Sequence, residues 1–288
     1  MSDKAKILLQ LDADPQPSVF DRVVAVDAGA EQVFSYGGVK PEQVQALVHG
    51  CIFTRGPKDL HRTAIFIGGS DVTAGEALLA AVKQALLPKW GLQVSVLLDS
   101  NGANTTAAAA VRAASRHLEL KDAKALVLGG TGPVGQRVAR LLVRQGSHVR
   151  VGSRQLARSA AVCQALRAAV AGANVEPAAT GTAAELAAAL AGQTLAIAAG
   201  AAGAVLLPKS APRGELRVAI DLNAVPPLGI EGVEMADKAK ERDGLLCYGA
   251  IGVGDTKMKI HKAALAKLFE RNDQILDAED VYAIATGI

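Results

Sequence analysis

The sequence predicts an α/β protein: a Rossmann-type doubly wound parallel sheet plus a smaller α/β substrate domain, with a cleft between them. Short apolar segments alternate with helical segments along the whole chain, a pattern typical of parallel sheets. Residues 123–158 indicate a strand, a glycine-rich turn, a helix and a second strand. With 288 residues and 50% hydrophobic composition, the chain can bury the cores of two domains.

The first third of the chain alternates predicted strands with helices. The strands span residues 7–11, 32–36, 63–67 and 94–98. Ligands bind beyond the carboxyl ends of parallel strands, so we expect substrate loops at Asp12 and at Asp99. Candidate substrate contacts in the second loop are Asp99, Asn101 and Thr105. The alternative is that these three residues are ordinary caps and turn formers, for which their side chains are well suited.

The motif GxGxxG occupies residues 130–135, directly after a predicted strand at 126–128. We assign Gly130 to the tight turn, Gly132 to close approach of a pyrophosphate, and Gly135 to close packing of the helix. A purely structural glycine turn is the alternative. The candidate cofactor-binding residues of this segment are Gly130, Thr131, Gly132, Pro133, Val134 and Gly135.

The end of the next strand, residues 148–151, predicts NADP as the cofactor. An NAD enzyme usually places an acid here to bind the ribose 2′-hydroxyl, whereas this chain has Ser153 and Arg154, with Arg158 one helical turn further on. A hydroxyl and two guanidinium groups can bind a 2′-phosphate that a carboxylate would repel. The alternative is that both arginines are solvated surface charges. Ala199 and Asn223, which follow predicted strands, complete the candidate cofactor set.

Residues 249–257 are rich in glycine, and we expect a second loop there that enters a helix near Lys257. The helices predicted at about 256–270 and 278–285 are expected to return to the first domain. The predicted domains are therefore residues 1–105 with 263–288 for the substrate, and residues 106–262 for NADP.

Composition excludes several other classes of protein. The net charge of +3 and an aromatic content of 3% argue against nucleic-acid binding. Three scattered cysteines and the lack of a signal-peptide core favour the cytoplasm. Residues 186–207 are uncharged and long enough to span a membrane, but their many Ala and Gly residues favour a helix end, a buried strand and a loop. Five dispersed histidines predict no metal site.

Longer segments are far more specific than GxGxxG. They are residues 17–21 (PSVFD), 63–69 (TAIFIGG), 98–107 (LDSNGANTTA), 130–135 (GTGPVG), 223–230 (NAVPPLGI) and 257–261 (KMKIH). On these segments the chain resembles, nearly end to end, the NADP-dependent methylene-tetrahydromethanopterin dehydrogenases of methylotrophic bacteria.

This resemblance implies hydride transfer from methylene-tetrahydromethanopterin to NADP, giving the methenyl form and NADPH in the one-carbon metabolism of formaldehyde oxidation. It implies that Phe20 and Lys257 line the pterin and the reacting carbon, and we add the neighbouring Asp21 to the candidate substrate contacts. It also implies a compact homo-oligomer, a trimer or a hexamer. The alternative for Lys257 is an ordinary solvated lysine.

The expected chemistry agrees with the absence of a catalytic His or Cys motif. Ring nitrogens of the substrate stabilise the cation left by hydride loss, so the protein mainly has to hold donor and acceptor together. A methylene-tetrahydrofolate dehydrogenase, or an enzyme that uses both pterins, remains open because the reacting ring is closely similar. A non-catalytic NADP-sensing module is the remaining alternative.

Overall fold

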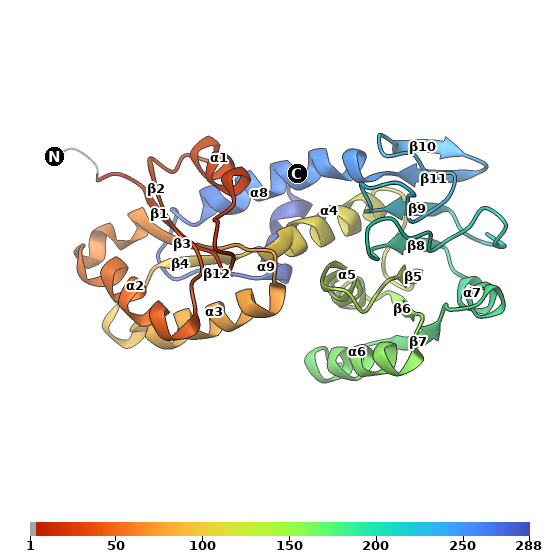
Figure 1. The fold of residues 1–288 in the computed structure, drawn as a ribbon, viewed down its shortest axis with the longest axis horizontal. Coiled ribbons are helices and arrows are strands. Elements are labelled where there is room, and N and C mark those ends of the chain that lie inside the picture. The colour runs from red at the N-terminus through yellow and green to blue at the C-terminus, as the bar shows by residue number, and fades with distance from the viewer. Residues whose placement is uncertain (1–3) are drawn as a thin grey trace. The chain divides into compact units, whose positions relative to one another are not determined.

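The computed structural model describes residues 4–288, which form two compact units. Unit 1 runs to Thr105 and includes Met258–Ile288, and unit 2 is Thr106–Lys257. Two helices, α4 (Ala103–Ser115) and α8 (Ala250–Lys267), contribute residues to both units. Each unit has a parallel or mainly parallel sheet with helices beside it, which confirms the predicted α/β class with parallel sheets (Figure 1).

Unit 1 contains a five-stranded parallel sheet in the order β12-β4-β3-β1-β2. Its strands are β1 (Ile7–Leu11), β2 (Gln32–Tyr36), β3 (Thr63–Ile67), β4 (Ser95–Leu98) and β12 (Ile275–Leu276). Its helices are α1 (Val19–Asp27), α2 (Pro41–Phe53), α3 (Val72–Ala85) and α9 (Ala278–Thr286), with short 3-10 turns at Pro57–Arg62, Pro88–Trp90 and Ser100–Gly102. The short strand β12 was not predicted from the sequence, because two residues carry no periodic pattern.

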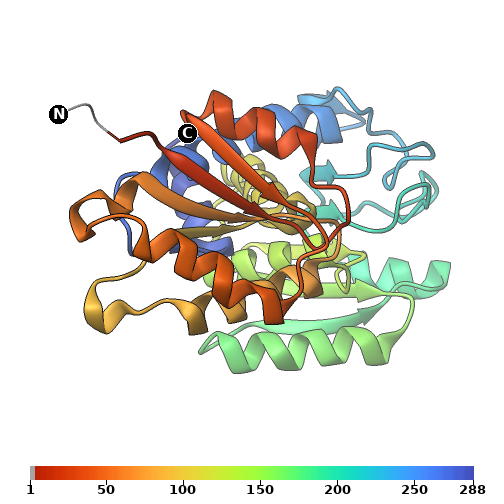
Figure 2. The ribbon, with the colours of Figure 1, turned by 60° about the vertical axis from the view of Figure 1, so that its left-hand side comes forward.

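Side chains alternate between the two faces of the sheet in unit 1. Leu9, Leu11, Ile65 and Ile67 point to one face, where they pack with residues of α2 and α3. Phe66, from the position between the last two, points to the other face, towards α8. Figure 2 shows α2 and α3 along one side of the sheet and α1 along the other. The carboxyl ends of the parallel strands therefore share one edge, where the loops after β1, β3 and β4 meet.

Unit 2 contains a seven-stranded sheet in the order β10-β11-β9-β8-β5-β6-β7. Its strands are β5 (Lys124–Leu128), β6 (His148–Ser153), β7 (Val175–Ala179), β8 (Leu195–Ala198), β9 (Val218–Asp221), β10 (Lys238–Arg242) and β11 (Leu245–Tyr248). Its own helices are α5 (Pro133–Arg144), α6 (Leu156–Ala169) and α7 (Ala183–Leu190). Counted from β5 in chain order, the six parallel strands follow the order 3-2-1-4-5-6 of the dinucleotide-binding fold.

The structure corrects two expectations about unit 2. The strand β10 was not predicted, and it pairs antiparallel with β11. The predicted glycine-rich loop at 249–257 is instead helical, because α8 begins at Ala250. A Cβ atom on Gly252 would lie 1.8 Å from the carbonyl oxygen of Asp237, so this glycine allows the helix to approach the preceding loop. Close packing, not flexibility, explains the glycines here.

Candidate functional site

The glycine-rich turn of unit 2 joins β5 to α5. Gly129 has a left-handed φ of 66°, and a Cβ atom on it would lie 2.5 Å from the Cα atom of Gly200. The tight turn therefore depends on Gly129, not on Gly130 as the sequence suggested. A Cβ atom on Gly130 would instead lie 2.8 Å from a methyl group of Val151, and one on Gly135 would lie 2.6 Å from the Gly129 carbonyl oxygen. Neighbouring strands and the helix can approach only because these positions lack side chains.

This turn lies where the strand order of unit 2 reverses, between β5 and β8. Gly132 is the N-cap of α5 and Pro133 its first residue. The backbone N–H groups of the first turn have no partner within the helix, and together with the helix dipole they suit phosphate oxygens. A Cβ atom on Gly132 would already lie 3.4 Å from the Gly129 carbonyl oxygen. The turn therefore fits the pyrophosphate of a dinucleotide.

The end of β6 carries the residues that suggested NADP. Ser153 is buried, and its hydroxyl accepts the backbone N–H of Gln155 at 3.2 Å. Arg154 and Arg158 are exposed beside the start of α6. The nearby Glu185 is engaged elsewhere, because its carboxylate accepts the N–H groups of Gly181 and Thr182 at 3.0 and 2.9 Å. This arrangement leaves the cationic side chains of Arg154 and Arg158 at the end of β6, while the nearby carboxylate of Glu185 is engaged in capping α7.

The loop after β9 is folded by buried polar side chains. The Asp221 carboxylate accepts the backbone N–H groups of Asn223 at 3.0 Å and Ile230 at 2.7 Å. Burial raises the pKa of Asp221, although these N–H donors oppose the rise. Asn223 accepts the Val225 N–H at 3.0 Å through its side-chain oxygen. Asn223 was predicted to bind the cofactor, and the structure shows that its side chain also shapes the loop.

In unit 1 the loop after β1 is organised by Asp12, which is fully buried. Its carboxylate accepts the backbone N–H groups of Asp14 at 2.9 Å and of Ser18 at 3.2 Å. Burial raises the pKa of Asp12, against the effect of these two hydrogen bonds. A Cβ atom on Gly69 would lie 2.8 Å from Asp12 Oδ1, so the loop after β3 must carry glycine there. Asp12 therefore sets the path of the chain into α1.

In the loop after β4, the side chain of Asp99 caps the first turn of α4. Asp99 is buried, and its Oδ1 atom accepts the N–H groups of Asn104 and Thr105 at 2.9 and 3.0 Å. Its Oδ2 atom accepts the Thr105 hydroxyl at 2.6 Å. The geometry favours the capping interpretation for Asp99 and Thr105. Asn101 differs, because it is exposed and has a left-handed φ of 54°.

The first turn of α1 presents two predicted substrate contacts. Phe20 is 50% exposed, and the Asp21 side chain is 17% exposed. His261, which lies on α8 and is fully buried, has its Nε2 atom 4.0 Å from Asp21 Oδ1. His261 closes the segment 257–261 that carries the family resemblance, but no role was predicted for it, because nothing in the local sequence shows that it lies beside Asp21. Lys257, four residues earlier on α8, is half-buried and is the last residue of unit 2.

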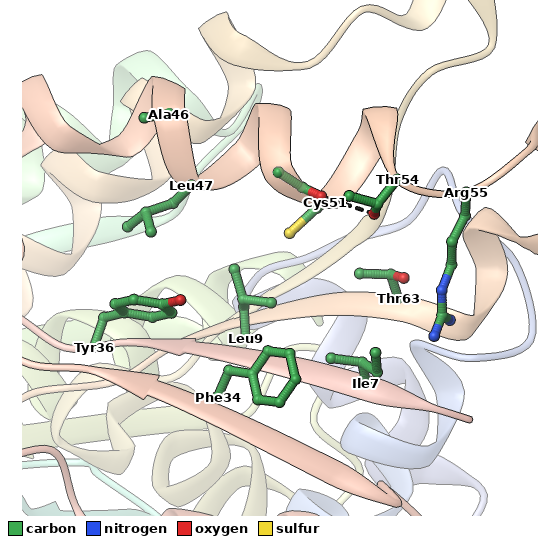
Figure 3. A pocket seen from close by; sticks show the side chains of 11 residues that line it. Ile7, Leu9, Phe34, Tyr36, Ala46, Leu47, Cys51, Thr54, Arg55 and Thr63 are labelled. Atoms are coloured by element: carbon green, nitrogen blue, oxygen red, sulfur yellow. Dashed lines mark hydrogen bonds between the residues drawn. The ribbon is translucent and has the colours of Figure 1, made fainter. Parts of the chain in front are cut away.

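A separate pocket lies on the opposite face of the sheet in unit 1. It has a volume of about 460 Å³ between α2 and the first two strands (Figure 3). Leu9, Phe34, Tyr36 and Leu47 give it a mainly apolar lining. Burial raises the pKa of the Cys51 thiol, which also lines it, to about 12, so this thiol is unreactive at neutral pH. None of the predicted site residues lines this pocket.

The strand order and the glycine turn define a Rossmann-type dinucleotide-binding protein. Comparison with known proteins defines the family. Residues 19–101 match the family described as methylene-tetrahydromethanopterin dehydrogenase, N-terminal. The chain is also 44% identical to the bifunctional protein MdtA of Methylorubrum extorquens over 97% of this chain and 98% of that protein.

A second relative from Methylorubrum extorquens is 32% identical over 94% of both chains and is named NAD(P)-dependent methylenetetrahydromethanopterin dehydrogenase. The chain therefore belongs to the methylene-tetrahydromethanopterin dehydrogenase family, as its motifs predicted. Among solved structures, the 5-ketofructose reductase of a Gluconobacter strain shares the fold, with a TM-score of 0.55, 15% identity and 99% of each chain covered. Within residues 4–288, no helix is long and apolar enough to cross a membrane.

Proposed function

We propose that this enzyme transfers a hydride from methylene-tetrahydromethanopterin to NADP. The observation that carries the proposal is the full-length relationship to a curated dehydrogenase named for this substrate. The reaction balances without a further reactant, since the neutral methylene ring loses a hydride to become the methenyl cation and NADP accepts that hydride to become NADPH. Unit 2 holds NADP, and unit 1 holds the pterin.

In the proposed NADP site, backbone donors bind the pyrophosphate and side chains select the cofactor. The first-turn N–H groups of α5 face the phosphates, and the missing side chains at Gly130, Gly132 and Gly135 allow close approach. Arg154 and Arg158 bind the 2′-phosphate through charge-assisted hydrogen bonds. Ala199 and Asn223, which follow β8 and β9, would hold the nicotinamide half of the cofactor. When NADP is bound, it supplies the hydride acceptor.

In the proposed pterin site, the protein orients the ring and performs no proton transfer. The exposed Phe20 ring packs on the bicyclic pterin, and Asp21 and Asn101 hydrogen-bond to its polar edge. Asp99 and Thr105 hold the loop that carries Asn101. Lys257 donates a hydrogen bond that fixes the pterin. Its ammonium group lies away from the carbon on which positive charge develops, because a cation beside that carbon would destabilise the transition state.

A second candidate substrate is methylene-tetrahydrofolate, since the reacting ring is closely similar and the relative with 44% identity is named a bifunctional protein. Steady-state assays with each methylene pterin, and with NADP or NAD, test the proposal. We expect turnover with methylene-tetrahydromethanopterin and NADP to exceed every other combination. Equal rates with NAD and NADP would contradict the cofactor assignment. Binding of NADP without turnover of either pterin would indicate a sensing module.

We further propose that the enzyme works in the cytoplasm as a homo-oligomer, as expected from the sequence. Sedimentation of the purified protein tests the trimer against the hexamer.

A further inference from the structure

His261 lies directly behind the two residues of α1 that are proposed to meet the pterin. Its ring centroid lies 6.3 Å from that of Phe20 and 5.7 Å from that of the buried Phe66, with tilts of 32° and 34°. Its Nε2 atom lies 4.0 Å from Asp21 Oδ1, and the imidazole itself is 1% exposed. A buried imidazole thus contacts a half-exposed ring and a carboxylate together.

The surroundings of His261 fix its position within unit 1. The next residue of α8, Lys262, forms an ion pair with Asp27 at the end of α1, at 2.8 Å. A Cβ atom on Gly68 would lie 3.0 Å from a ring carbon of Phe66 and 3.5 Å from Asp21 Oδ2. A glycine at this position therefore leaves space beside the carboxylate that any other residue would fill.

We propose that His261 is a positioning residue, which orients the Asp21 carboxylate, and with it the first turn of α1, for the pterin. This inference rests on the proposed function. The amino-pyrimidinone edge of a pterin presents adjacent N–H donors, and a carboxylate can accept two of them at once if its plane is held. The imidazolium presents a positively charged Nε2–H group to Oδ1, and the neutral tautomer with its proton on Nε2 presents the positive end of an N–H dipole.

The contact with Asp21 contributes more to this role than the ring contacts do. Little water surrounds the pair, so the attraction at 4.0 Å is stronger than it would be on an exposed surface. Aromatic contacts set the tilt of the Phe20 ring, but a phenyl ring could replace the imidazole in that respect. The two contributions can therefore be separated by substitution.

Two variants of the full-length enzyme provide the test. His261→Phe keeps a ring and removes the polar contact, whereas His261→Gln keeps an amide donor near the Nε2 position and removes the ring. We expect His261→Phe to lower kcat/KM for the pterin roughly ten- to hundredfold, mainly through KM, and His261→Gln to restore much of it. The dissociation constant for NADP should stay unchanged in both. His49→Phe, the same exchange on α2, is the matched control.

A double-mutant cycle with Asp21→Asn identifies the path of the effect. If His261 acts through Asp21, then His261→Phe should have little further effect on the pterin KM in the Asp21→Asn background. Additive effects, equal losses in both His261 variants, or a lowered melting temperature with unchanged pterin KM would overturn the inference. A wild type that turns over neither pterin would refute the proposed function instead. If the wild type binds a pterin without turning it over, binding measured by fluorescence replaces the kinetic test. Weaker pterin binding by His261→Phe than by the wild type would then support the positioning role.

Discussion

The two units form the carboxyl ends of their sheets in different ways. In unit 2 the turn after β5 is made from backbone, and Gly129, Gly130 and Gly135 matter because they have no side chain. In unit 1 the loops after β1 and β4 are made from side chains, since the buried carboxylates of Asp12 and Asp99 accept backbone N–H groups. A backbone site can be recognised from glycine spacing, whereas a side-chain site depends on contacts between distant residues.

The largest expected effect comes from the backbone site. Gly129→Ala places a Cβ atom 2.5 Å from Gly200 at a left-handed φ of 66°, so we expect a loss of roughly 2–4 kcal/mol of unfolding free energy and no saturable NADP binding. Gly172→Ala is the control, because its φ is 72° but nothing lies within 4 Å of the new atom. It should cost only about 1 kcal/mol. Denaturant unfolding and NADP titration of both variants test the difference.

If Gly129→Ala and Gly172→Ala lowered the free energy of unfolding equally, close packing would not be the reason why the turn requires glycine.

The next effect concerns Lys257, which the sequence placed where a glycine-rich loop enters a helix and which the structure places inside α8. Lys257→Ala should lower kcat by a factor on the order of ten to a thousand through lost orientation of the pterin. Lys257→Arg should recover only part, because a planar guanidinium cannot replace a point donor. Lys259→Ala, an exposed lysine two residues further on, should leave kcat unchanged.

The pH profile of kcat decides between orientation and proton transfer for Lys257. A wild-type ionisation that disappears in Lys257→Ala would contradict the orienting role.

What the sequence could predict follows the same division. The strands β1, β3 and β5, the helix start at Pro133 and the family were predictable, because periodicity, GxGxxG and the longer motifs are local signals. The positive φ of Gly129 was not, since it depends on contact with Gly200 from a distant loop. His261 and the fold of the Asp221 loop were missed for the same reason. Strand β12 was missed because it has only two residues, and β10 was missed because its exposed, charged sequence has no apolar alternation.

A smaller effect is expected at the end of β6. Arg154→Ala should raise KM for NADP roughly ten- to hundredfold, equivalent to about 1.5–3 kcal/mol, because a charge-assisted phosphate contact is lost. KM for NAD should stay almost unchanged, since NAD has no 2′-phosphate. Arg217→Ala is the control. Arg217 is exposed and precedes β9, so it lies at the amino end of that strand, whereas the proposed cofactor site lies at the carboxyl ends. Parallel changes in both cofactor constants would favour the alternative that Arg154 is an ordinary surface charge.

The smallest effect concerns two buried carboxylates, whose contributions to the free energy of unfolding should depend on pH in opposite directions. We expect each change to stay within about 1–2 kcal/mol. Burial raises the pKa of Asp12. Above about pH 4 the unfolded state therefore binds fewer protons than the folded state does. The contribution of Asp12 to the free energy of unfolding falls as the pH rises towards the pKa of the folded state. For Asp237 burial acts in the same direction, but the Arg242 guanidinium, at 2.7 and 2.8 Å, prevails and lowers the pKa. Its contribution is therefore present above about pH 4 and is lost as pH falls through the folded pKa.

Substitution by Asn should reveal these opposite signs in urea unfolding between pH 3 and pH 7. The deficit of Asp12→Asn relative to wild type should shrink as pH rises, because the variant no longer has a carboxyl group that must ionise in a buried site. The deficit of Asp237→Asn should grow over the same range, because the wild type gains its ion pair with Arg242. If both deficits grew with pH, the pKa of Asp12 in the folded state would be lowered and not raised. The loop after β1 would then be stabilised by the ionised carboxylate of Asp12.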